Sequence, residues 1–178
     1  MKTLALSTKR LQLDTVVLSD LPKIHELLSI PKVDQYNTLG IPTNKEVTAV
    51  YFDEWVDSFR MRKEFVFSIK LLNTSEFLGL ISLKIGTPKY RIGSVWYKLH
   101  PDFWGKGYAT EATKRILQLG FKDLELHRIE AGCAVDNMGS IRVLEKVGMI
   151  REGRKRKVLP LKTGWSDNYE YAILHEDW

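Results

Sequence analysis

Two glycines near the middle of the chain have the spacing of an anion-binding turn. Gly105 and Gly107 lie within residues 99–112, between a predicted strand and a predicted helix. Glycine permits positive φ and lets a ligand approach the backbone, and the free N–H groups of a helix N-terminus attract phosphate. The segment therefore predicts a pyrophosphate cradle, although a plain tight turn would use the same residues. It is not the G-x-G-x-x-G fingerprint of dinucleotide-binding sites, because Thr110 stands where the third glycine would be. It is not a P-loop either, because no Gly-Lys-Ser/Thr sequence ends it.

Histidine and cysteine provide little further chemistry. The four histidines have no paired spacing of the kind that metal ligands show, so we expect no metal site. Cys133 lies in an apolar segment and is expected to be a core thiol rather than a nucleophile.

Length and composition indicate one globular domain over residues 1–178. The chain is 44% hydrophobic and 28% charged, and no apolar run approaches the ~20 residues of a membrane-spanning helix. The apolar stretch before Lys9 is too short for a signal peptide, and a single cysteine fits a reducing compartment. We therefore expect a cytoplasmic protein. Its net charge of +5 favours anionic partners without choosing among them.

Hydrophobic periodicity and turn residues predict a mixture of strands and helices around the glycine turn. A run of small and apolar residues at 128–135 suggests a strand buried on both faces. The Thr43-x-x-Glu46 spacing suggests a capping box. The fold class is α/β or α+β, with strands expected at 10–16, 65–72, 77–85, 94–99, 128–135, 151–161 and 169–174, and helices at 20–30, 43–61, 108–124 and 137–146.

The glycine turn resembles a loop of a known family. Residues 104–109, Trp-Gly-Lys-Gly-Tyr-Ala, are similar to the acetyl-CoA pyrophosphate loop of the GCN5-related N-acetyltransferases (GNAT superfamily). The narrower resemblance is to the ribosomal-protein alanine acetyltransferase, or RimJ/RimL-like, branch. Further blocks in the same order support it, at residues 8–13, 127–131, 137–140, 145–149, 152–153 and 164–167. The resemblance implies a single-domain GNAT fold, with a mixed, mostly antiparallel sheet flanked by helices and a splayed strand pair forming the acetyl-CoA cleft.

The resemblance also implies binding roles for individual residues. Backbone N–H groups near Tyr97, Lys98 and Leu99 would polarise the thioester carbonyl and stabilise the oxyanion. Asn137 would contact the pantetheine arm. The pyrophosphate would be held by Trp104, Gly105, Lys106, Gly107, Tyr108, Ala109 and Thr110, with Lys106 adding a charge-assisted contact.

The chain departs from the family pattern at two positions. Trp104 stands where the loop has Gln or Arg, which removes a side-chain donor but leaves the backbone cradle. Many relatives have a tyrosine seven residues after the asparagine that protonates the departing thiolate, and here that position is Leu144. The resemblance therefore makes Ser140 the catalytic candidate for a hydrogen bond to the sulfur, the alternative being a residue that only caps or packs the helix. The base that accepts the amine proton is left open among Glu64, Asp167 and a water chain.

The resemblance implies an enzyme that transfers acetyl from acetyl-CoA, as co-substrate and without a metal, to a primary amine by direct attack through a tetrahedral intermediate. We expect the acceptor to be a protein N-terminus of the ribosomal-protein type. The alternative is a small amine such as a polyamine, an amino-acid derivative or an antibiotic. A third reading is an inactive RNA- or ribosome-binding module, motivated by Trp104, Leu144 and the five basic residues among 151–157. Neither a membrane nor nucleic acid is required, and a homodimer is the assembly common among relatives.

Overall fold

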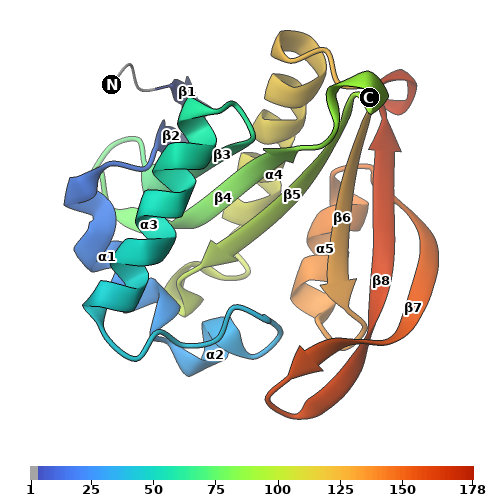
Figure 1. Cartoon of the computed structure of the whole chain (residues 1–178). Helices are drawn as coiled ribbons and strands as arrows, with labels where there is room; N and C mark the ends of the chain where they lie inside the picture. The colour runs from blue at the N-terminus through green and yellow to red at the C-terminus, as the bar shows by residue number, and fades with distance from the viewer. Residues whose placement is uncertain (1–3) are drawn as a thin grey trace.

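One mixed sheet of eight strands organises the computed structural model, which describes residues 4–178. The spatial order is β1-β2-β3-β4-β5-β6-β8-β7 (Figure 1). Neighbouring strands are antiparallel except for the central pair β5–β6. The strands are β1 Ala5–Ser7, β2 Leu11–Thr15, β3 Glu64–Leu71, β4 Phe77–Ile85, β5 Ile92–Leu99, β6 Arg128–Ala134, β7 Ile150–Leu161 and β8 Gly164–Leu174.

Helices cover both faces of this sheet. The helices are α1 Leu21–Leu28, α2 Pro31–Asp34, α3 Lys45–Arg60, α4 Tyr108–Gln118 and α5 Met138–Lys146. One apolar cluster joins α1, α2 and α3 to β3 and β4 through residues such as Ile24 and Phe52. A larger cluster joins α4 and α5 to the opposite face, where Ile116 and Leu144 are buried. The predicted fold, a mostly antiparallel mixed sheet between helices, is confirmed.

The two central strands separate soon after they meet. β5 pairs with β6 only at Ile92, Gly93 and Ser94, although β5 continues to Leu99 and β6 to Ala134. Beyond Ser94, β5 stays paired with β4 while β6 stays paired with β8. The sheet therefore opens between the C-terminal halves of β5 and β6, which is the splayed pair that the resemblance implied.

Several local predictions were wrong. Asn44 rather than Thr43 caps α3, because its side-chain oxygen accepts the Val47 amide at 3.0 Å. The helix predicted over 108–124 is α-helical only to Gln118 and ends in a π-helical turn. β6 is not buried on both faces, since Gly132 is exposed. The stretch after α1, predicted as loop, contains α2, and β1 was missed.

The described residues show neither a membrane-spanning helix nor a metal cluster. No helix within residues 4–178 is long and apolar enough to cross a bilayer. Over the same residues, no three His, Cys, Asp or Glu side chains are grouped so that they could hold a metal ion. Residues 1–3 of the segment that we expect not to be a signal peptide lie outside the described range.

Candidate active site

The glycine turn leads directly into α4. Gly105 and Gly107 have φ of 74° and 81°, and Gly107 is the N-cap of the helix. This left-handed conformation is costly for residues with a Cβ, which explains both glycines. The first hydrogen bond within α4 is donated by the Glu111 amide to the Gly107 carbonyl. The backbone amides that precede Glu111 in the helix therefore have no acceptor within the helix. The turn and the first turn of α4 thus present backbone N–H groups at the positive end of the helix dipole.

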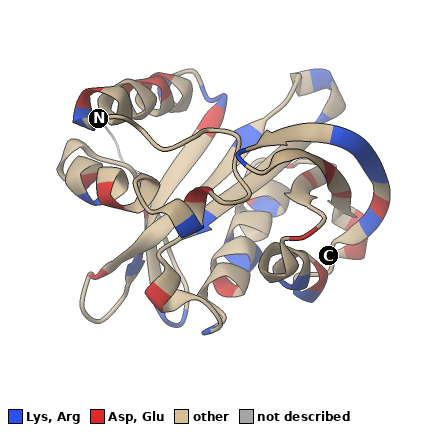
Figure 2. Cartoon of the chain, turned by 90° about the horizontal axis from the view of Figure 1, so that it is seen from below, with Lys and Arg blue, Asp and Glu red and all other residues tan. Residues whose placement is uncertain are grey.

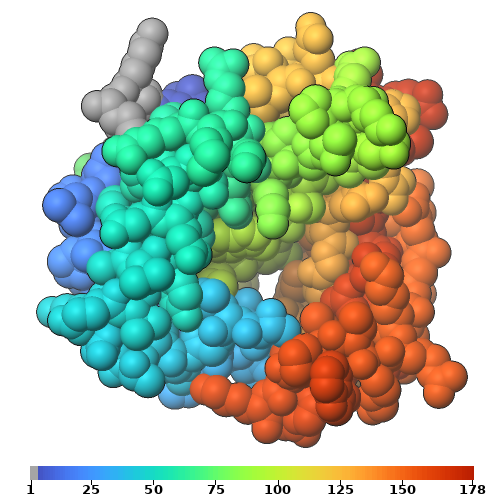
Figure 3. Space-filling view, viewed as in Figure 1, coloured from blue at the N-terminus to red at the C-terminus, as the bar shows by residue number. Residues whose placement is uncertain are grey.

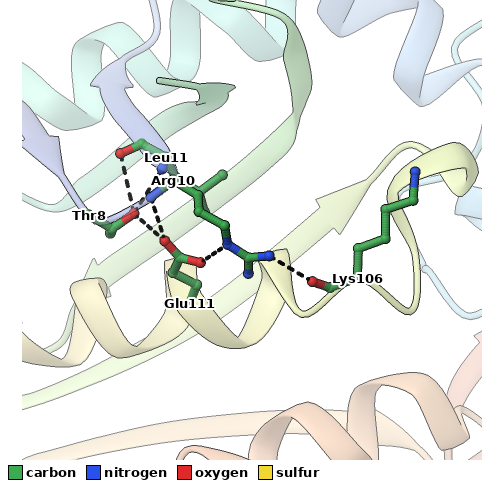
Figure 4. A network of polar contacts seen from close by, with 5 residues as sticks. All are labelled: Thr8, Arg10, Leu11, Lys106 and Glu111. Atoms are coloured by element: carbon green, nitrogen blue, oxygen red, sulfur yellow. Dashed lines mark hydrogen bonds and ion pairs between the residues drawn. The ribbon is translucent and has the colours of Figure 1, made fainter. Parts of the chain in front are cut away.

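An ion pair from the N-terminal strand region holds this turn in place (Figure 4). Glu111 on α4 accepts hydrogen bonds from Thr8 Oγ1 (2.7 Å), Arg10 N (2.9 Å) and Arg10 Nε (2.6 Å). Arg10 Nη1 then donates to the Lys106 carbonyl at 3.1 Å, and its guanidinium lies 4.5 Å from the Tyr108 ring centroid. Burial alone would raise the pKa of Glu111, but the bonds from Thr8 and Arg10 outweigh it and lower that pKa. The carboxylate therefore anchors Arg10 across the turn.

The end of β5 presents amides to the open side of the sheet. The His100 amide donates to Leu78 O on the β4 side at 2.8 Å. Since successive backbone amides of a strand point in opposite directions, those of Tyr97 and Leu99 point away from β4, towards the splay. The Trp104 indole donates to the Leu99 carbonyl at 2.8 Å from that same side. Trp104 therefore braces the end of β5 instead of simply removing a donor from the loop.

A tyrosine from β5 reaches Ser140 across the splay. Tyr97 Oη lies 2.8 Å from Ser140 Oγ. Burial raises the pKa of Tyr97, so the phenol stays protonated and can donate. The expected family tyrosine is absent at Leu144, which is buried in the core. The Ser140 hydroxyl on α5 thus has the Tyr97 phenol on β5 as its hydrogen-bond partner.

The residues around Ser140 have structural roles as well. Asn137 is the N-cap of α5, because its Oδ1 accepts the Ser140 amide at 3.0 Å. The cap of this helix is therefore Asn137 and not Ser140, and the Nδ2 group of Asn137 takes no part in the cap. Cys133 is 6% exposed, and burial raises the pKa of its thiol to about 11, which fits the predicted core thiol.

These elements enclose a cleft of about 570 Å³. It is lined by every predicted site residue except Lys106, so the structure brings together Tyr97, Lys98, Leu99, Trp104, Gly105, Gly107, Tyr108, Ala109, Thr110, Asn137 and Ser140. The Lys106 ammonium instead lies 5.6 Å from the Phe103 ring centroid. Among the described residues, the charged lining consists of Lys32, Lys98, Arg142, Lys146 and one carboxylate, Asp136. The cleft is therefore net positive, which suits a phosphate-bearing ligand.

One wall of the cleft was not predicted. Lys32, Val33 and residues 35–37, in and just after α2, also line it. In Figure 3 the surface is hollowed above the light-blue α2 region, between the green β4–β5 segment and the orange C-terminal part of the chain. Pro31 at the helix start, where proline is favoured, was the one sequence signal available for α2.

The basic segment 151–157 lies on β7, an exposed edge strand, along which Figure 2 shows a run of Lys and Arg. Several of its charges have partners on β8. Arg154 pairs with Asp167 at 2.6 Å, and Lys155 pairs with Glu170 at 3.2 Å. The Arg151 guanidinium lies 4.5 Å from the Tyr169 ring centroid. This pattern is that of a solvated strand face, and it weakens the observation that motivated an RNA-binding module.

The chain is similar to known acetyltransferases over nearly its whole length. The acetyltransferase (GNAT) domain family matches residues 10–150. A Bacillus subtilis protein described as the uncharacterized N-acetyltransferase YnaD is 35% identical over 175 residues, 97% of this chain and 98% of that protein. The crystal structure of a GNAT-family acetyltransferase from Bacillus anthracis superposes with a TM-score of 0.86 at 31% identity, covering 97% of this chain and 99% of that one.

More distant structures share the fold but differ in acceptor. RimL, a ribosomal alpha-N-protein acetyltransferase in complex with coenzyme A, has a TM-score of 0.88 at 20% identity and covers 96% of this chain and 98% of its own. Spermidine N-acetyltransferase from Vibrio cholerae, in complex with CoA and spermine, has a TM-score of 0.86 at 21% identity with the same coverage. Since sequence similarity and architecture agree over the glycine turn, the splayed strands and the helices between them, this chain belongs to the GNAT family and is an acetyl-CoA-dependent N-acetyltransferase.

Proposed function

We propose that this enzyme acetylates the α-amino group of a protein N-terminus, with ribosomal proteins as the acceptor class. The charge of the cleft carries the proposal. Three cationic residues (Lys32, Arg142 and Lys146) and the side-chain amine of Lys98 line it against the single carboxylate of Asp136 among the described residues. A polyamine is recognised by several carboxylates, whereas a peptide N-terminus carries one positive charge and brings its own backbone hydrogen-bonding groups. The narrower RimJ/RimL-like relationship is part of this proposal.

Acetyl-CoA would lie along the splay. Its pyrophosphate would accept hydrogen bonds from the amides of residues 105–110, at the positive end of α4. Trp104 would border the pyrophosphate site on the side of the glycine turn. The Lys106 side chain would have to move away from the Phe103 ring to contact the pyrophosphate. The amide group of Asn137, left free by its capping role, would contact the pantetheine arm.

The reacting carbonyl would then lie near the end of β5. The amides of Tyr97 and Leu99 would stabilise the oxyanion that forms when the amine attacks. The Lys98 amide, which was predicted to share this role, points towards β4 like the amide of His100. Collapse of the tetrahedral intermediate releases a thiolate. Ser140 Oγ would donate a hydrogen bond to that sulfur, while the protonated Tyr97 phenol donates to Ser140 Oγ over 2.8 Å. This pair takes the place of the family tyrosine that Leu144 replaces.

A small amine is the second candidate acceptor. The fold accommodates both kinds of substrate, because its structural neighbours include a ribosomal-protein and a spermidine acetyltransferase. We place the reaction in the cytoplasm, where a lone buried thiol such as Cys133 remains reduced. We propose one domain over residues 1–178, and the homodimer stays a prediction.

Label transfer tests the acceptor. The enzyme is incubated with radiolabelled acetyl-CoA and a cytosolic extract, which is then separated into macromolecular and small-molecule fractions. We expect label on protein, at an N-terminal residue located by peptide mass spectrometry, and no label with the Gly107→Val variant. Label confined to small molecules would refute the N-terminal acceptor and favour the small amine. Binding of acetyl-CoA without transfer to either fraction would contradict catalysis itself.

A further inference from the structure

Neither carboxylate considered for accepting the amine proton lies in the cleft. Glu64 Oε1 accepts hydrogen bonds from Ser82 Oγ (2.6 Å) and from Trp96 Nε1 (2.8 Å). Asp167 accepts from the Lys157 amide (2.9 Å) and from Arg154 (2.7 Å), and these bonds lower its pKa. Neither residue is among those that line the cleft. Neither carboxylate is therefore placed to take the proton by direct contact with an amine in the cleft.

Lys98 is a primary amine placed at the reacting end of the cleft. It lies on β5 between Tyr97 and Leu99, and it lines the cleft. Side chains alternate along a strand, so Lys98 projects to the same face as Trp96, which packs against Trp55 of α3. The Lys98 side chain thus lies on the α2 side, across the strand from the Tyr97 and Ser140 hydroxyls.

A buried carboxylate on α2 acts electrostatically on Lys98. The Asp34 side chain at the end of α2 is 4% exposed, and its Oδ2 lies 2.8 Å from Lys162 Nζ in the β7–β8 turn. Neither Asp34 oxygen accepts a hydrogen bond of normal geometry from the described residues. Figure 3 shows the α2 region meeting the tip of the β7–β8 hairpin below the hollow. Asp34 therefore provides a buried negative charge at the end of α2, and this charge acts on Lys98.

We propose that the neutral side chain of Lys98 is the general base that takes the proton from the acceptor amine, and that Asp34 is its positioning residue. The inference rests on the proposed function, since it concerns the same cleft and the same reaction. The amine nitrogen forms a bond to the thioester carbonyl carbon as the carbonyl electron pair moves to oxygen. One N–H proton passes to Lys98 Nζ. The C–S bond then breaks with its electron pair on sulfur, and the Lys98 ammonium formed in the step faces the charge of Asp34.

The protonation of Lys98 suits this role. Burial lowers the pKa of Lys98 to about 8, while the nearby Asp34 carboxylate works in the opposite direction. A peptide α-amino group has a pKa of ~7.7–8.0, so proton transfer between the two groups is nearly balanced. A general base is most effective when its pKa lies near the working pH. An ordinary surface lysine, with a pKa of ~10.4, would be almost fully protonated there.

Other titratable groups lie on the elements around this lysine. The α2 wall contributes Asp34 together with Lys32 and the Tyr36 phenol, and the β7–β8 turn contributes Lys162. Across the cleft, α5 and the residue before its cap contribute Arg142, Lys146 and Asp136. The two members of the Asp34–Lys162 pair therefore have opposite effects on the pKa of Lys98. Removing the Asp34 charge lowers the pKa of Lys98, and removing the Lys162 charge raises it.

The first measurement is the protonation of Lys98 itself. The intact protein is labelled with trace acetic anhydride between pH 6 and 11, and Lys98 is followed by peptide mass spectrometry with exposed Lys45 as internal reference. We expect a pKa near 8 in the wild type, a lower value in Asp34→Asn and a higher one in Lys162→Met. Both variants break the same ion pair, so structural damage alone would move the two in the same direction. A wild-type pKa near ~10.4 would overturn the inference.

The second measurement is acetyl transfer to a probe hexapeptide with a free alanine N-terminus. Lys98→Arg keeps the charge but cannot be deprotonated, so we expect kcat to fall at least ~100-fold with the KM for acetyl-CoA within about two-fold. Lys84→Arg, on an exposed position of β4 outside the cleft, is the matched control and should match the wild type. A Lys98→Arg rate within about three-fold of wild type overturns the general base and leaves the proposed function intact. A wild-type enzyme that never acetylates the peptide refutes the proposed function instead, and the labelling result still decides whether Lys98 has the required protonation.

Discussion

Replacing Glu111 with Gln tests whether the N-terminal segment holds the pyrophosphate turn. Gln keeps the shape of the side chain, and its oxygen can still accept from Thr8 Oγ1 and the Arg10 amide, as Oε1 does now. Its NH2 group, however, would face Arg10 Nε, which donates to Oε2 at 2.6 Å in the wild type. The variant thus replaces one charge-assisted bond with two opposed donors, and Arg10 loses the anchor from which it reaches the Lys106 carbonyl.

The magnitude follows from the exposure of the pair. A hydrogen bond between charged groups contributes about 1.5–3 kcal/mol. The Arg10 side chain is 43% exposed, so solvent screening reduces the expected loss to roughly 1–2 kcal/mol. For a chain of this size that corresponds to a fall in Tm of about 2–8 °C. The loosened turn should also weaken coenzyme A binding by about 2–10-fold, the equivalent of one ordinary hydrogen bond.

Circular dichroism melts and isothermal titration calorimetry with coenzyme A measure the two effects. Asp57→Asn is the matched control, because Asp57 and Arg60 form an ion pair on α3 in which both side chains are more than half exposed. Its loss should cost only ~0.3–0.5 kcal/mol and leave coenzyme A affinity unchanged. If Glu111→Gln behaved like Asp57→Asn in both assays, the turn would not depend on this network.

The same pair predicts a pH dependence. The pKa of Glu111 is lowered on folding, so its contribution to stability is fully present above the unfolded-state value of ~4.3 and is lost as the pH falls through the folded-state value. The Tm difference between wild type and Glu111→Gln should therefore be constant near neutrality and shrink below pH ~4. A difference that grew on acidification would contradict this sign.

Three further variants and one labelling experiment test the site. Gly107→Val places a β-branched residue at φ 81°, so it should abolish measurable coenzyme A binding in calorimetry, whereas Gly153→Val, with open space around it on β7, should bind as the wild type does. Ser140→Ala should lower kcat about 10–100-fold with little change in the KM for acetyl-CoA, and an unaltered rate would exclude Ser140 as the partner of the thiolate. Trp104→Phe removes the bond to the Leu99 carbonyl and should lower kcat about 2–10-fold; full activity would mean that this brace is dispensable. Because burial raises the pKa of Cys133 to about 11, its reaction with a disulfide reagent should accelerate only as the pH approaches that value, and rapid labelling at pH 8 would contradict the burial argument.

The amino-acid sequence by itself determined the features that depend on local backbone requirements. Gly105 and Gly107 are needed wherever a turn has positive φ, and that need is visible without any knowledge of neighbours. The helices after the turn and after Asn137 follow from periodicity and capping chemistry, which extend over a few residues. Where these local predictions were wrong, the error was small. The N-cap of α3, for example, is Asn44, one residue after the predicted Thr43.

The tertiary structure decided the features that depend on residues far apart in the chain. The sequence predicted a role for the backbone amide of Tyr97 alone. The structure shows in addition that the Tyr97 phenol extends across the splay between β5 and β6 and contacts Ser140. Lys98 was likewise expected to act through its amide, but burial of its side chain beside Asp34, more than sixty positions earlier, changes its acid–base chemistry. Desolvation and ion pairing depend on what packs around a group in three dimensions, and no local pattern in the sequence encodes that packing.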